Sequence, residues 1–200
     1  TLRTTATVLG LTLFGLVMVA ITGIGFVIFR GGKQARKGRA EWLAAGRTGH
    51  DGVMLDFLHK DTMGDYVQLV RDGAATTGNR PRICYSTMIV TSQADMDAAR
   101  PHMTYRLVDS PPHVKERLGI TADDVERIRR AMPDGLEAAA EHVREEWVTP
   151  FVIAGTASEC AAELAGLMER HGVDEFLLPV LDLRFAIDTM QQVADVLALA

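Results

Sequence analysis

The sequence has few cysteines, and this excludes two kinds of small domain. Only Cys84 and Cys160 occur among 200 residues, far apart and without a CxxC spacing. A disulfide framework and a structural zinc site both require several cysteine or histidine ligands at characteristic spacings. We therefore expect two reduced thiols, as is usual for a cytoplasmic protein.

The chain also lacks an excess of positive charge. Its formal net charge is -5, which gives no reason to expect a nucleic-acid partner. Hydrophobic residues make up 48% and charged residues 24% of the chain. This composition excludes a disordered polymer and suits one domain with a core, or part of a larger domain. Basic residues are concentrated between Arg30 and Arg47, where Glu41 is the single acid.

Charge is absent from residues 4–29, and two structures fit this apolar run. As a helix, about 25 residues would span the hydrocarbon core of a membrane, with the basic residues that follow on the cytoplasmic side. The same residues also fit a pair of buried strands interrupted at Thr22-Gly23. We therefore separate an apolar segment at 1–25, with a transmembrane helix as one interpretation, from a domain at 26–200.

After this run, extended and helical patterns alternate. Short apolar runs predict strands at 26–29, 51–58, 80–92 and 173–181. Segments with helical spacing follow these runs and predict helices at 33–47, 61–78 and 184–200. In the first helix we expect Ala40, Leu43 and Ala44 to face inward, with Trp42 as a further candidate for this face. This alternation predicts parallel βαβ units with the helices outside the sheet.

One long stretch interrupts the alternation. Residues 93–147 contain only helical patterns and turns, and Thr121 to Asp124 reads TADD, which is typical of a helix start. We interpret this stretch as a helical insertion between a strand and the next βα unit. Such an insertion can cover a substrate pocket, or it can serve only as a packing or oligomer surface.

Three segments carry a resemblance to a known family. They read FVIFRGGKQARKGRAEWLAAGRTGHDGVMLDF, GAATTGNRPRICYSTMIVTSQADMDAAR and FVIAGTASECAAELAGLMERHGVDEFLLPVL. In order and spacing they resemble the C-terminal half of the luciferase-like monooxygenases, which are flavin- or deazaflavin-dependent TIM-barrel enzymes. The resemblance runs from Phe26 to the C-terminus and implies an α/β fold, a partial (β/α) TIM-barrel-like domain.

The first half of such a barrel is missing from this sequence. About four βα units cannot close an eight-stranded barrel, and Thr1, not methionine, begins the chain. Three interpretations follow: a fragment of an enzyme, a membrane-anchored non-catalytic remnant that acts as an interaction module, or a homo-oligomer that completes the barrel between chains.

The loop after the first predicted strand is the best candidate for a cofactor site. Gly31 and Gly32 allow backbone N–H groups to approach a phosphate, and the following helix start favours an anion. Lys33 and Gln34 add donors. The other helix start, Thr156 to Glu159, is a capping box whose donors are satisfied internally. The resemblance likewise implies that this glycine loop holds the phosphate of FMN or of the deazaflavin coenzyme.

Other polar residues are weaker candidates. His50, Asp51, Asp56 and His59 flank the strand at 51–58, and Asp56, at its end, is the best of them. No Ser/His/Asp arrangement, metal-ligand spacing or P-loop is present, and no catalytic residue is assigned. The resemblance implies an oxidoreductase or monooxygenase that acts on a small molecule and uses a flavin or deazaflavin. The alternative is the non-catalytic interaction module.

Overall fold

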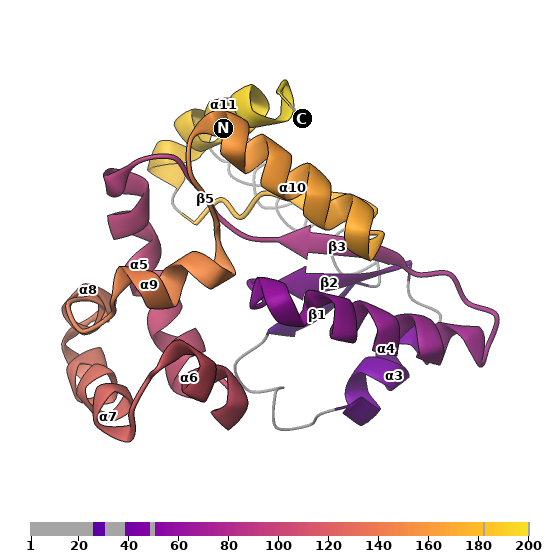
Figure 1. The fold of residues 1–200 in the computed structure, drawn as a ribbon, viewed down its shortest axis with the longest axis horizontal. Helices are drawn as coiled ribbons and strands as arrows, with labels where there is room; N and C mark the ends of the chain where they lie inside the picture. The colour runs from indigo at the N-terminus through magenta and orange to yellow at the C-terminus, as the bar shows by residue number, and fades with distance from the viewer. Residues whose placement is uncertain (1–25, 31–38, 49–50, 182, 200) are drawn as a thin grey trace, which may run out of the picture.

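The structure is a computed structural model that describes residues 26–30, 39–48, 51–181 and 183–199. Its centre is a sheet of four parallel strands in the order β1-β2-β3-β6, namely β1 (Phe26–Arg30), β2 (Gly52–Asp56), β3 (Arg82–Ser86) and β6 (Glu175–Leu177) (Figure 1). A separate parallel pair joins β4 (Ile89–Val90) to β5 (Ile153–Ala154). The predicted parallel α/β arrangement is confirmed.

The helices that connect the strands pack on one face of the sheet. They form a layer in which each helix contacts the next: α3 (Arg39–Arg47), α4 (Met63–Ala75), α10 (Ala157–His171) and α11 (Ala186–Leu197). Short 3-10 turns, η1 (Lys60–Thr62) and η4 (Leu183–Phe185), precede α4 and α11. Alternate strand residues such as Val53, Leu55 and Ile83 point into this layer, and they form one hydrophobic cluster with residues of all four helices.

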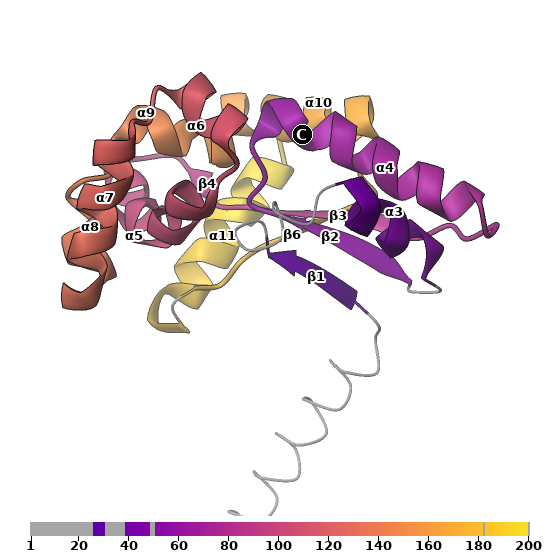
Figure 2. The same ribbon diagram turned by 90° about the horizontal axis from the view of Figure 1, so that it is seen from below.

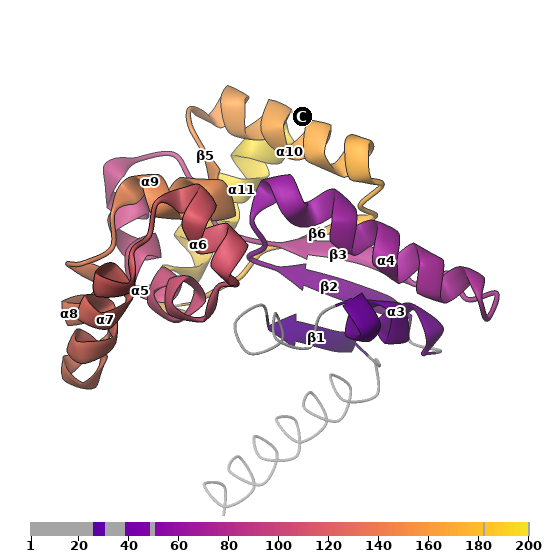
Figure 3. The same ribbon diagram turned by 60° about the horizontal axis from the view of Figure 1, so that its bottom comes forward.

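The predicted helical insertion is present and has a core of its own. It comprises α5 (Gln93–Asp109), α6 (Pro112–Leu118), α7 (Ala122–Ala131), η2 (Met132–Asp134), α8 (Leu136–Ala140), α9 (Glu145–Val148) and η3 (Thr149–Phe151). Figure 3 shows these helices beyond the arrowheads of β2 and β3. Met103, Ile128 and Trp147 are fully buried among them. The helix starts at Thr121 and Thr156 both form complete capping boxes.

Two predicted strands were too long. The strand expected at 80–92 divides at residues 87–88, because Thr87 is buried and its hydroxyl donates to the carbonyl of Phe151 at 2.5 Å. After this bond the chain leaves the main sheet and pairs with β5. The last strand ends at Leu177, two residues before Pro179, which has no N–H group to donate.

The inward face of α3 agrees with the prediction only in part. Trp42 is buried, as one of the expected residues, but Ala40 and Ala44 are exposed, and Ala45 and Gly46 are buried in their place. The reason is a close approach of α3 to α4, in which Gly46 lies against the backbone of α4 and Gly73 lies against the backbone of α3. Trp42 then packs on Tyr66, with the ring centroids 4.8 Å apart.

Most of the apolar run lies outside the described residues. In the part of the chain that the structure describes, no helix is long and apolar enough to cross a membrane. Residues 1–25 are not described, so the boundary between this segment and the domain stays a prediction.

Candidate functional site

The strands end together at one edge of the main sheet. Arg30, Asp56 and Ser86 are the last residues of β1, β2 and β3, and the pairing register aligns their Cα positions. In parallel α/β folds, ligands bind at this carboxyl edge. The predicted phosphate-binding residues Gly31, Gly32, Lys33 and Gln34 lie outside the described residues. In the sequence they follow Arg30 directly.

Asp56 occupies this edge, but it has an ion-pair partner. Its carboxylate lies 2.5 Å from a guanidinium nitrogen of Arg106 on α5, and the same guanidinium donates to the Asp56 carbonyl at 3.0 Å. Both side chains are mostly buried. The pair joins the helical insertion to the end of β2, so Asp56 serves as an anchor and is not a free base. No local pattern in the sequence indicated Arg106, which lies 50 residues from Asp56.

The residue after Asp56 has an unusual backbone conformation. Phe57 has a φ of 48°, a region that bulky residues rarely adopt. Its N–H donates to the Ser86 carbonyl at 2.8 Å, and its ring lies 4.5 Å from the Arg106 guanidinium carbon. Arg106 therefore holds both the carboxylate and the ring. Strained conformations of this kind concentrate near functional sites.

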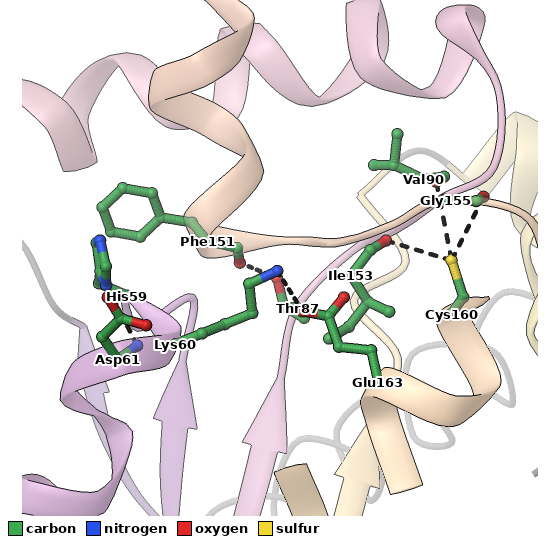
Figure 4. A network of polar contacts seen from close by, with 10 residues as sticks. All are labelled: His59, Lys60, Asp61, Thr87, Val90, Phe151, Ile153, Gly155, Cys160 and Glu163. Atoms are coloured by element: carbon green, nitrogen blue, oxygen red, sulfur yellow. Dashed lines mark hydrogen bonds and ion pairs between the residues drawn. The ribbon is translucent and has the colours of Figure 1, made fainter. Parts of the chain in front are cut away.

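His59, three residues after Asp56, has a structural role as the N-cap of the 3-10 turn η1. Its Nδ1 accepts the backbone N–H of Asp61 at 3.3 Å, and its ring packs edge-on against Phe151 (Figure 4). Burial lowers the pKa of His59, which favours the neutral ring at pH 7. The cavity beside it measures about 40 Å³, too small for a substrate.

Two further contacts in Figure 4 join distant elements. Lys60 and Glu163 form an ion pair at 2.6 Å between η1 and α10. The Cys160 sulfur lies 3.6–3.9 Å from three backbone oxygens of the β4–β5 region, where it is fully buried. Burial raises its pKa, and burial beside Glu175 raises that of Cys84 to about 12. Neither thiol is suited to act as a nucleophile.

A pocket of about 590 Å³ is formed by residues of the described part of the chain. It lies between α5 and α11, beside β4 and the segment that follows β6. Figure 2 shows α11 passing between the sheet and the insertion. Much of the lining is apolar, including Ile89, Leu178 and Phe185, and no lysine or arginine is among the described residues that line it. Its volume is in the range that holds small organic ligands.

A hydrogen-bond network joins lining residues of this pocket on α5 and α11. The Asp95 carboxylate accepts from the backbone N–H of Thr91 at 2.9 Å and from its hydroxyl at 3.1 Å. It also accepts from the Gln192 amide at 2.9 Å, which connects α5 to α11. Asp188 and His102 add polar groups to the lining. The sequence could not indicate this network, because Gln192 lies 97 residues from Asp95.

The charge of the lining limits which ligands can enter. Asp95 and Asp188 are the acidic groups, and no cationic side chain among the described lining residues offsets them. A phosphate would therefore be repelled here, whereas a flat, uncharged ring could pack against Phe185 and Leu178. In the sequence, by contrast, the residues that follow Arg30 are rich in glycine and basic side chains.

Known proteins share this fold. A family model described as luciferase-like monooxygenase matches residues 39–175. The structure of coenzyme F420-dependent tetrahydromethanopterin reductase from Methanopyrus kandleri matches with a TM-score of 0.62 and 23% identity, covering 78% of this chain and 47% of that one. An F420-dependent secondary alcohol dehydrogenase in complex with an F420-acetone adduct gives 0.48 and 17%, covering 80% and 46%.

A third structure is the oxygenating constituent of 3,6-diketocamphane monooxygenase from Pseudomonas putida, in complex with FMN. It gives a TM-score of 0.42 and 16% identity, covering 78% of this chain and 43% of that one. The chain therefore spans less than half the length of these three structures. At these identities, the likeness to solved structures shows the fold alone.

Proposed function

The chain belongs to the luciferase-like monooxygenase family, and on this premise we propose that it forms part of a flavin- or deazaflavin-dependent oxidoreductase. The observation that carries the proposal is the pocket between α5 and α11, at the edge of the sheet where such folds bind ligands. We assign the cofactor phosphate to Gly31, Gly32, Lys33 and Gln34, and the uncharged ring to the pocket.

The described residues fit the ring end of such a cofactor. The pocket provides a flat aromatic wall at Phe185, apolar contacts from Leu178 and Pro179, and hydrogen-bonding groups at Thr189 and Gln192. When bound, a flavin or deazaflavin supplies the redox chemistry, while the protein positions the ring and shapes the space around it. The insertion helix α5 would exclude water on one side and form the wall against which the substrate lies.

The charges of the site support this orientation of the cofactor. The acidic pocket lining disfavours the phosphate, and the basic residues after β1 attract it, so one orientation is preferred over its reverse. The Asp56–Arg106 pair lies at the same edge and positions α5 relative to β2. No residue of the described part is assigned to proton transfer.

Filling the pocket tests this proposal. Ala98 on α5 lines the pocket, and its replacement in Ala98→Trp would occupy the space of a ring. Ala162→Trp is the matched control, because Ala162 is also an exposed helical alanine but lies on α10, away from this pocket. Both variants and the wild-type chain are titrated with FMN and with coenzyme F420.

We expect Ala98→Trp to weaken binding of the preferred cofactor by at least about tenfold, since the cofactor ring loses its apolar contacts with the pocket. Ala162→Trp should bind as the wild-type chain does. Equal affinities for all three proteins would contradict the placement of the ring. An absence of binding in the folded wild-type chain would favour the non-catalytic interaction module.

A further inference from the structure

One side of α11 forms a wall of the pocket between α5 and α11. Phe185, at the start of the helix, and Asp188, Thr189 and Gln192 all line this pocket. Their spacing of three and four residues places them on the same side of the helix. Phe185 supplies an aromatic surface, and the other three side chains are polar. The hydrogens and lone pairs that these polar groups leave unused decide which ligand groups the wall can bind.

The side-chain amide of Gln192 has its orientation fixed by Asp95. The amide nitrogen lies 2.9 Å from the Asp95 carboxylate and 2.8 Å from the hydroxyl oxygen of Thr91. That hydroxyl in turn donates to the same carboxylate at 3.1 Å. An ionised carboxylate can only accept hydrogen bonds, so the reverse orientation of the amide would place two oxygen atoms against each other. The remaining polar atom, Gln192 Oε1, accepts no hydrogen bond from the described part of the chain.

The other polar groups on this side of α11 are acceptors as well. The Thr189 hydroxyl donates to the carbonyl of Phe185 at 2.9 Å, so its hydrogen is used and its lone pairs remain. Asp188 contributes a carboxylate, which accepts. The wall therefore offers a ligand an amide oxygen, a hydroxyl oxygen and a carboxylate. A ligand group that donates a hydrogen bond suits this wall, whereas a ligand carboxylate or phosphate does not.

We propose that this side of α11 recognises the N–H edge of the cofactor ring and that Gln192 determines its specificity; the inference rests on the proposed function. Oxidised flavin and deazaflavin rings both carry a hydrogen on ring nitrogen N3, between two carbonyl groups. Gln192 Oε1 would accept from this N–H, and hydrogen bonds to ring nitrogens are one means by which a protein orients and tunes such a cofactor. Asp95 is a positioning residue, because it acts only through the amide that it orients.

Methylation of the ring at N3 tests this inference, because it removes the donor and leaves the charge of the ring unchanged. Calorimetric titrations of the wild-type chain use FMN, coenzyme F420 and the N3-methyl derivative of each. The wild-type chain should bind one cofactor at least about tenfold more tightly than the N3-methyl derivative of that cofactor, since methylation leaves the acceptor in the pocket without a hydrogen bond.

A substitution on α11 tests the role of the amide. Gln192→Met keeps a side chain of similar length and removes the acceptor, so the preference for the unmodified cofactor should fall below about threefold. The matched control is Gln191→Met, one residue away. Gln191 donates to Asp195 at 2.8 Å and is not among the residues that line the pocket, so this variant should keep the wild-type preference. Circular dichroism verifies that both variants are folded.

The outcomes separate this inference from the proposed function. If the folded wild-type chain binds neither cofactor, the proposed function fails and the inference fails with it. Equal affinities for a cofactor and its N3-methyl derivative, or a preference that survives in Gln192→Met, would overturn the inference while the proposed function stands. The same holds if Gln191→Met loses the preference as fully as Gln192→Met does.

Discussion

The substitution Gly73→Ala adds one methyl group and should weaken the packing of α3 against α4. A Cβ atom at this position would overlap the carbonyl group of Leu43, and one at Gly46 would overlap the carbonyl of Val70. The obstacle in both cases is backbone, which cannot move aside as a flexible side chain can. Because α3 follows the predicted phosphate loop, this contact also bears on the placement of that loop.

The expected effect follows from two opposing contributions. Alanine is favoured over glycine within a helix by about 1 kcal/mol, and forcing extra volume into a packed contact costs about 1–3 kcal/mol. With rigid backbone as the obstacle, we expect the cost to be larger, so Gly73→Ala should lower the free energy of unfolding by about 1–2 kcal/mol. Gly166 on α10 has open space around it. The control Gly166→Ala should instead raise the free energy of unfolding by about 0.5–1 kcal/mol.

Urea unfolding followed by circular dichroism measures both variants, with the slope of each transition compared as a test of two-state behaviour. The two substitutions should change the free energy of unfolding in opposite directions. If Gly73→Ala proves as stable as Gly166→Ala, then α3 does not approach α4 as closely as the structure shows.

Three further predictions concern the ion pair at the sheet edge, a capping box and the thiols. Arg106→Met and Asp56→Asn should show a coupling of about 1 kcal/mol or more in a double-mutant cycle of unfolding, because the pair is mostly buried; additive effects would contradict this. Hydrogen bonds from the capping threonine lower the pKa of Asp124 from 3.8 to about 2, so its stabilisation is complete above pH 3.8 and is lost as the pH falls toward 2. Asp124→Asn should remove this part of the pH dependence of the free energy of unfolding. A pH profile of unfolding that is the same in the variant and the wild-type chain would contradict the prediction. Cys84 and Cys160 are buried with raised pKa values, so a thiol reagent should modify both only after unfolding; rapid labelling of the native protein would contradict this.

The fold could be predicted from local patterns in the sequence. Apolar runs predicted β2 and β3, and the TADD and TASE motifs predicted two helix starts. These predictions were possible because each signal depends only on residues that are neighbours in the sequence. The division of the strand at Thr87 could not be predicted, since it depends on the carbonyl of Phe151, 64 residues away. For the inward face of α3 the prediction was right for Trp42 and wrong for Ala40 and Ala44, because the close approach of glycines on two helices decides which side is buried.

The candidate site was only partly predictable. The glycine loop after β1 is a local motif and could be proposed from the sequence, although it lies outside the described residues. The network that joins Asp95 to Gln192, and the pair that joins Asp56 to Arg106, arise from residues 50 or more positions apart. Such contacts depend on the helical insertion folding back over the sheet edge, which no short motif encodes.

The most direct test of the proposed function is a calorimetric titration of the wild-type chain with FMN and with coenzyme F420, repeated on Gly31→Asp. Gly166→Asp, which adds the same charge at an open position on α10, is the control. Saturable binding of one cofactor by the wild-type chain and Gly166→Asp, lost in Gly31→Asp, is the predicted result, because the added carboxylate repels the phosphate. Binding that survives Gly31→Asp, or no binding of either cofactor by the folded chain, would contradict it.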